Sequence, residues 1–160
     1  MLLAIALPVY ALDQVTKWWI LDRSNGVIGW NEPVIPGFFE LYYLANTGAA
    51  FSMFKNNNAF FIGLCFVALA VLVVCTVRAV FRDRLSQAGA GLLAGGILGN
   101  LTDRLIHGHV VDFLLFDLHI RFADPWPAFN VADSSICVAA GLFILASFFE
   151  EKKNSRDAES

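Results

Sequence analysis

The sequence predicts an all-α membrane protein with four transmembrane helices and a small β-rich element in the first outer loop. Hydrophobic residues make up 58% of the 160 positions, only 16% are charged, and the mean hydropathy is +0.62. A soluble domain carries about 25% charged residues, so lipid is the expected main solvent. The apolar residues also gather in four stretches, each close to the length of about 20 residues that a spanning helix needs.

The four stretches form a single domain and follow one another along the whole chain. The predicted spans are residues 2–21, 59–77, 85–106 and 131–149, and the predicted outer loops are residues 22–58 and 107–130. The second span contains no charge, the third is uncharged until Asp103, and the fourth contains Asp133 alone. The first contains Asp13 and Lys17 but lacks the basic start and small-residue cleavage site of a secretory signal, so we expect it to be retained.

Basic residues assign the loops to the two sides of the membrane. The turn after the second span and the C-terminal tail hold Arg78, Arg82, Arg84, Lys152, Lys153 and Arg156. The two long loops hold only Arg23, Lys55 and Arg121. Because Lys and Arg mark cytoplasmic loops, both termini are expected in the cytoplasm, and the long loops outside.

The first outer loop has the composition of β-structure. Residues Val34–Phe54 read VIPGFFELYYLANTGAAFSMF, a run rich in β-forming residues and punctuated by Pro36, Gly37 and Gly48. Such a pattern favours two or three short strands lying on the outer membrane surface.

Polar side chains gather near the outer ends of the predicted spans. They are Asp13, Lys17, Asn100, Asp103, Arg104, Asp112, Asn130 and Asp133. Ionisable groups in membrane helices are costly and are functional candidates for that reason. A conducting pore needs polar groups along its whole length, whereas a site of chemistry needs them at one depth, as here.

Several of these residues also have purely structural interpretations. Asp13 and Lys17 have the spacing of a local ion pair. Asp103 and Arg104 fit either a pair at a helix end or a functional site. Asn130 is a typical helix cap, and Asp133 in the first turn gains from the helix dipole. None of these explanations covers Asp112, which lies between apolar residues in HVVDFLLF.

Two close aspartates in a partly dry site can hydrolyse a peptide bond. Since both cannot easily ionise, they hold one proton between them. Asp112 and Asp133 are the best-placed pair, and this chemistry requires no metal or other cofactor. A zinc site at His107 and His109 lacks a third ligand, and a Ser–Lys dyad using Lys17 is a weaker alternative.

Five ordered motifs resemble those of bacterial lipoprotein signal peptidase, or signal peptidase II. They are DQVTK (Asp13–Lys17), NTGAAFS (Asn46–Ser52), GGILGNLTDR (Gly95–Arg104), GHVVDF (Gly108–Phe113) and PAFNVADS (Pro127–Ser134). The resemblance implies an aspartic endopeptidase of the bacterial plasma membrane that removes the signal peptide of a prolipoprotein. It would cut before the cysteine that carries a diacylglyceryl group, near the outer leaflet.

The same resemblance assigns roles to individual residues. Asp112 and Asp133 would be the catalytic pair. Substrate would be positioned by Asn46, Asn100, Arg104 and Asn130, and the site would be supported by Asp13, Lys17, Gly48 and Asp103. The implied partners are the lipid-modified signal peptide and membrane lipid, with no metal or cofactor.

Two other functions, a transporter and a scaffold, explain the sequence less well than a peptidase does. A small proton-coupled transporter also uses membrane carboxylates, but it predicts them near the midplane and often in inverted repeats. A non-catalytic scaffold would use Gly91, Gly95 and Gly99 as a dimer face, and it leaves Asp112 unexplained. A net charge of -3 with scattered basic residues does not favour nucleic acid as a partner.

Overall fold

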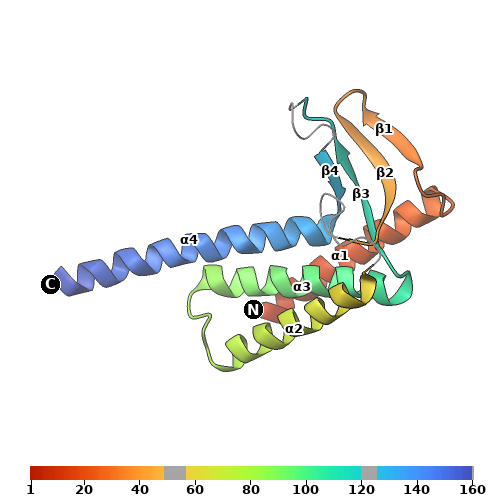
Figure 1. The fold of residues 1–160 in the computed structure, drawn as a ribbon. Helices are drawn as coiled ribbons and strands as arrows, with labels where there is room; N and C mark the ends of the chain where they lie inside the picture. The colour runs from red at the N-terminus through yellow and green to blue at the C-terminus, as the bar shows by residue number, and fades with distance from the viewer. Residues whose placement is uncertain (49–56, 120–125, 160) are drawn as a thin grey trace.

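The computed structural model describes residues 1–48, 57–119 and 126–159. Within these ranges the elements are α1 (Leu2–Arg23), β1 (Asn31–Ile35), β2 (Phe39–Asn46), α2 (Asn58–Val77), α3 (Arg84–Ile106), β3 (Val110–Phe116), β4 (Trp126–Phe129) and α4 (Val131–Glu159). The strands form one sheet at one end of the helices (Figure 1). Both termini and the α2–α3 turn lie toward the other end (Figure 1).

All four predicted spans are helical, and three of them match a helix to within two residues at each end. The fourth span matches the start of α4, which continues ten residues further, to Glu159. Of the described residues, two segments are long and apolar enough to cross a membrane: α2, with a mean hydropathy of 2.9, and Val131–Phe149, with 1.9. α1 and α3 have 22 and 23 residues but carry buried polar groups, so the four-span topology stays a prediction.

α3 is the central helix, and it contacts α1, α2 and α4. Small residues allow this close packing. A Cβ added at Gly95 would lie 2.8 Å from the Ala6 carbonyl oxygen in α1, and one at Gly96 would lie 2.6 Å from the Ala132 carbonyl oxygen in α4. The predicted packing stripe is therefore confirmed. Its partner, however, is α1 of the same chain, and not a second copy as the scaffold hypothesis requires.

The sheet has the order β1-β2-β3-β4 with antiparallel neighbours. The prediction of strands in the first outer loop is confirmed by β2, and β1 begins at Asn31, three residues before the predicted range. Residues 49–54 of that prediction lie outside the described part. β3 and β4 come from the second outer loop and were not predicted. β4 has four residues and includes Pro127, so its sequence carries little strand signal.

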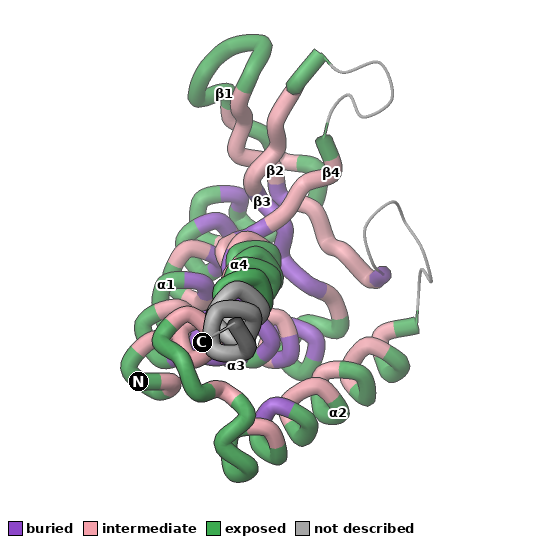
Figure 2. Tube along the Cα trace, turned by 90° about the vertical axis from the view of Figure 1, so that its left-hand side faces the viewer, coloured by how far each residue is buried: buried purple, intermediate pink, exposed green. Residues whose placement is uncertain are grey.

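The sheet is fixed to the end of α1 by a buried apolar cluster of Ile20, Tyr43, Val111 and Phe113. α3 ends at Ile106, and Gly108 follows with a φ of +77°. A glycine in this conformation is common just after a helix, because a Cβ disfavours it. The turn leads the chain straight into β3, and buried residues gather along α3 and β3 (Figure 2).

Candidate active site

Asp112 is the third residue of β3, and it is 1% exposed. In the β2–β3 ladder Asn46 lies opposite Val110, which makes it a diagonal neighbour of Asp112. The Asn46 side-chain nitrogen donates to Asp112 Oδ2 at 2.7 Å. On the other side, Asn130 Nδ2 donates to Asp112 Oδ1 at 2.8 Å. Both carboxyl oxygens therefore have amide donors.

Asp133 lies in the first turn of α4, next to the residue that caps this helix. The Asp133 backbone nitrogen donates to Asn130 Oδ1 at 2.9 Å, and the Asn130 backbone nitrogen donates to Asp133 Oδ2 at 3.3 Å. This reciprocal pair is a capping box, and it confirms Asn130 as a cap. Asn100 Nδ2 donates to Asp133 Oδ1 at 2.8 Å. The carboxylate also lies at the positive end of the α4 dipole.

The three asparagines around the two aspartates have a fixed orientation. Each carboxamide oxygen accepts a hydrogen bond from another part of the protein, so its nitrogen points toward an aspartate. The donors to Asn46, Asn100 and Asn130 are Gly48 N (3.0 Å), Lys17 Nζ (2.9 Å) and Asp133 N (2.9 Å), respectively. Since an amide must present one end as donor and the other as acceptor, these contacts aim the donor ends at the carboxyl groups.

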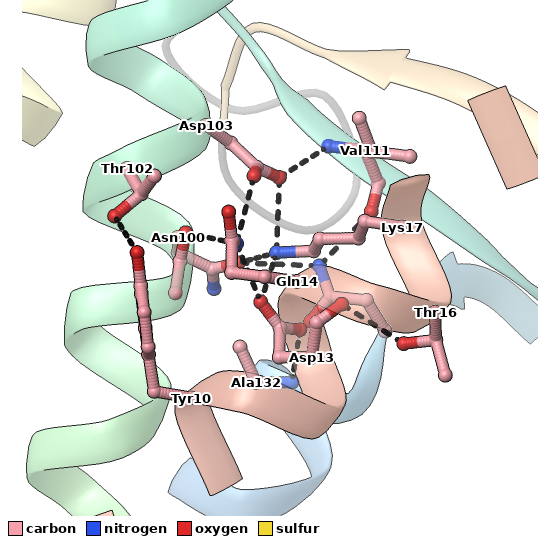
Figure 3. Close-up of polar contacts among 12 residues, drawn as sticks. Tyr10, Asp13, Gln14, Thr16, Lys17, Asn100, Thr102, Asp103, Val111 and Ala132 are labelled. Carbon is pink, nitrogen blue, oxygen red and sulfur yellow. Dashed lines mark hydrogen bonds and ion pairs between the residues drawn. The ribbon is translucent and has the colours of Figure 1, made fainter. Parts of the chain in front are cut away.

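A buried charge network lies next to Asn100 (Figure 3). Lys17 Nζ is 2.8 Å from Asp13 Oδ2 and 2.9 Å from Asp103 Oδ2. Gln14 Nε2 donates to the same two carboxylates, at 3.1 and 3.2 Å. The predicted Asp13–Lys17 pair is confirmed. Asp103 pairs with Lys17 and not with its neighbour Arg104, so the helix-end pairing is wrong.

The same two carboxylates hold the backbone just before each site aspartate. Asp103 Oδ2 accepts from the Val111 nitrogen at 3.0 Å, and Asp13 Oδ1 accepts from the Ala132 nitrogen at 2.9 Å (Figure 3). Val111 precedes Asp112, and Ala132 precedes Asp133 in the chain. Lys17 therefore links the two backbone segments that carry the site, although they come from β3 and α4.

Asp112 and Asp133 line one cavity of about 700 Å³. Its other polar walls are Asn46, Asn100, Arg104 and Ser134, and its apolar walls include Phe61, Val110, Trp126, Phe129, Ile136 and Val138. Asn130 is not part of the wall. It is 0% exposed and donates to Asp112 Oδ1, so its predicted role in positioning substrate stays a prediction. Its contacts suit it to hold Asp112 and not to touch a ligand.

Burial and the negative charge of Asp133 raise the pKa of Asp112 to about 8. The hydrogen bonds from Asn46 and Asn130 act in the opposite direction, because they stabilise the ionised form. Asp112 is thus held protonated near neutral pH. Together the two aspartates form a site that can both accept and donate a proton, which is the requirement of acid–base catalysis.

Arg104 lies on the cavity wall among neutral partners. Its Nη2 donates to the Gly48 carbonyl oxygen at 2.9 Å, and its Nη1 donates to Asn58 Oδ1 at 3.3 Å. The guanidinium also lies 4.4 Å from the centre of the Phe61 ring. Sequence reasoning missed Asn58 and Phe61, because at the start of α2 they have the signal of a cap and of a lipid-facing residue. It also missed Gln14, although a polar neighbour of Asp13 inside a span was a usable signal.

The chain is similar to known proteins along most of its length. A family model for signal peptidase (SPase) II matches residues 5–149. The chain belongs to the signal peptidase II family. The lipoprotein signal peptidase of Neisseria meningitidis serogroup C (strain 053442) is 43% identical over 159 residues, covering 95% of this chain and 92% of the relative.

Other relatives extend this similarity beyond one group of bacteria. The lipoprotein signal peptidase of Symbiobacterium thermophilum is 38% identical over 153 residues, covering 96% of this chain and 97% of the relative. A solved bacterial membrane enzyme matches with a TM-score of 0.82 and 31% identity, covering 94% of this chain and 88% of the other. A second has a TM-score of 0.76 and 34% identity, over 89% of each chain. This signal peptidase II family member thus shares the fold of membrane enzymes.

Proposed function

We propose that this chain is an aspartic endopeptidase that removes the signal peptide of prolipoproteins, cutting before the diacylglyceryl-modified cysteine. Asp112 and Asp133 would be its catalytic residues. The observation that carries the proposal is their joint position on one cavity, with Asp112 buried and its pKa raised to about 8. Membership in the signal peptidase II family supports the substrate class.

The hydrogen bonds of the two aspartates suggest how one proton is divided between them. Asp133 accepts from Asn100 and from the Asn130 backbone at the N-terminus of α4, which favours the negative charge there. Asp133 would take a proton from water as the water oxygen attacks the scissile carbonyl. Asp112 would donate its proton to the carbonyl oxygen. Breakage of the C–N bond, with transfer of a proton to nitrogen, then leaves a carboxylate and an amine.

The remaining site residues would position substrate and carboxyl groups. Asn46, Asn100 and Arg104 lie on the cavity wall, where they can contact a bound peptide. Asn130 would hold Asp112 from beneath, and the Lys17 network would fix the backbone of both catalytic residues. This division of roles fits a site whose polar groups must be preorganised before water attacks.

The proposal places the chain in the bacterial plasma membrane with four spans and both termini in the cytoplasm. α1 and α3 can cross lipid despite their polar residues because those residues bond to one another. Lys17, Asp13 and Asp103 form ion pairs at 2.8 and 2.9 Å and are at most 2% exposed. The cavity would then lie near the outer leaflet, beside the sheet. A proton-coupled transporter is not favoured, because the family is a peptidase family.

The proposed activity is tested with purified protein and a diacylglyceryl-modified precursor in detergent micelles. Mass spectrometry should show loss of the signal peptide, with the lipid-modified cysteine as the new N-terminus. The matched control is the same precursor without its diacylglyceryl group. Two acyl chains anchor the cysteine firmly at the interface, at about 0.8 kcal/mol per methylene, so kcat/KM should fall when they are absent. Absence of cleavage of the modified precursor would contradict the function.

A further inference from the structure

Arg104 is a buried cation whose partners in the described structure are all neutral. It lies in the last turn of α3 and is 7% exposed. Its contacts with the Gly48 carbonyl and the Asn58 side chain use two of the five N–H groups of a guanidinium. The ion pairs found among the described residues do not include it. Buried charges are usually paired. The carboxyl groups of Asp112, Asp133 and Asp103 act on Arg104 only from beyond ion-pair distance, so the guanidinium can still bind an anionic ligand.

The cavity itself shows where such a ligand would lie. Of the described residues that line it, Arg104 carries the positive charge, and Asp112 and Asp133 are the acids. Lys17 lies behind the wall, where its ammonium bonds to Asp13, Asp103 and Asn100. A negative group bound near the aspartates would therefore be repelled by them and attracted by Arg104.

The proposed reaction produces an anion at this place. Its substrate offers a neutral amide carbonyl. Addition of water to the carbonyl carbon and breakage of the C–N bond leave the signal peptide with a new terminal carboxylate, and the lipoprotein with an amine. A guanidinium binds a carboxylate through two parallel hydrogen bonds and more strongly than it binds a neutral carbonyl.

We propose that Arg104 forms, with the cavity wall, a binding site for the terminal carboxylate of the cleaved signal peptide. The ligand class is an apolar peptide with a free α-carboxylate, and its apolar part would contact the Phe61, Ile136 and Val138 side of the cavity. The inference rests on the proposed function, since that reaction supplies the carboxylate. If Arg104 binds this carboxylate, the cleaved signal peptide inhibits the enzyme. Arg104 then slows the release of this product.

The probe is one synthetic peptide, an apolar segment of about 15 residues ending in a small residue, made as a free acid and as a primary amide. Binding to wild-type protein in detergent is measured by isothermal titration calorimetry near pH 7. The acid should bind at least about tenfold more tightly than the amide, the range expected of charge-assisted hydrogen bonds. In Arg104→Gln this ratio should fall to about one, while Arg82→Gln, at an exposed position in the α2–α3 turn, should keep it.

A second variant keeps the test decisive if Arg104→Gln does not fold. Asp133→Asn removes negative charge from the cavity, so it should tighten binding of the acid and leave the amide unchanged. Equal affinities of acid and amide for a wild-type protein that cleaves its precursor would overturn the carboxylate site alone. A retained preference for the acid in a protein that cleaves nothing would overturn the proposed function alone.

Discussion

Asp112 lies in β3 and Asp133 in α4, yet both line one cavity. Asp112 accepts from Asn46 of β2 and from the Asn130 side chain, and Asp133 accepts from Asn100 of α3 and from the Asn130 backbone. If they share one proton, neither can work without the other. Asp112→Asn and Asp133→Asn should each lower turnover at least about a thousandfold, and the double variant should be little worse, because residues that act as a unit are not additive.

Turnover of a lipid-modified precursor measures this directly, with the helical signal in circular dichroism as the control for folding. Neither substitution adds a buried charge, so both variants should fold. A folded single variant with near-normal turnover would exclude that residue from catalysis.

The raised pKa of Asp112 predicts how activity depends on pH. The pKa of about 8 lies above the usual 3.8, so the folded protein binds this proton more tightly than the unfolded chain does. The contribution of Asp112 to the stability of the folded state therefore decreases as the pH rises from 3.8 to about 8. The protonated acid is lost above about pH 8, and kcat/KM should then fall about tenfold per pH unit.

Asn46→Ala provides the matched comparison. It removes a donor that stabilises ionised Asp112, so the alkaline fall should move to higher pH in this variant. Initial rates across the pH range, with a lipid-modified precursor lacking groups that titrate there, measure both profiles. A fall at the same pH in both proteins would show that Asp112 does not set it.

Some site residues could be predicted from sequence and others could not, for a physical reason. Asp112 was recognisable because no structural role explains a carboxylate in an apolar run. Asn58 was not, since its contact with Arg104 spans 46 positions and its local signal is that of a helix start. The error at Asp103 has the same origin. Its neighbour Arg104 is close in sequence, but Lys17 is the residue that the fold brings to it.

At the scale of elements, Lys17 joins α1 to α3 and, through Asp13 and Asp103, to α4 and β3. Lys17→Met should remove the cation and leave two buried carboxylates facing each other. Breaking a buried ion pair in this way costs about 3–5 kcal/mol. Turnover should also fall, because the Asn100 oxygen loses Lys17, the closer of its two donors, and keeps only Asn130 to orient its nitrogen toward Asp133.

Thermal unfolding and turnover of Lys17→Met measure the two effects. Arg23→Met is the control, because the Arg23–Glu32 pair is largely exposed and exposed pairs contribute little. Equal melting temperatures for Lys17→Met and the wild type would show that the network does not hold the elements together.

Glycines set the distance between α3 and α1. Gly95→Ala would place a Cβ 2.8 Å from the Ala6 carbonyl oxygen and 2.9 Å from Val9 Cβ. Overpacking of this kind costs about 1–3 kcal/mol, so the melting temperature should fall. Gly141→Ala in α4 is the control, because a Cβ there has no neighbouring atom within 4 Å. An unchanged melting temperature for Gly95→Ala would mean that α1 and α3 can move apart without loss of stability.

Helices were easier to predict than strands, because apolar length alone identifies a lipid-facing helix. α2 is the simplest case, with 20 residues and no charge. β3 has a strong apolar run, but its partner β2 comes from the other outer loop. Pairing of distant segments leaves no local pattern. The pairing of β2 with β3 and the diagonal contact between Asn46 and Asp112 could therefore be seen only in the structure.

At the scale of the whole molecule, charge and fold point to the same orientation. The basic α2–α3 turn and both termini lie at the end of the helices away from the sheet (Figure 1). The turn holds Arg78 and Arg82, and Arg84 is the first residue of α3. If all four helices cross the bilayer and this basic end is cytoplasmic, the sheet and the cavity beside it would face the outside, as the proposed function expects.

Labelling of single cysteines tests this arrangement. In a background with Cys65, Cys75 and Cys137 replaced by serine, Asn57→Cys at the start of α2 should react with an impermeant maleimide in intact spheroplasts. Arg84→Cys at the start of α3 should react only after the membrane is made permeable. Both positions are exposed and adjoin helix ends. The two cysteines should therefore differ in reactivity only if they lie on opposite sides of the membrane. The reverse pattern would place the cavity in the cytoplasm, and reaction of both in intact cells would mean that α2 does not cross the membrane.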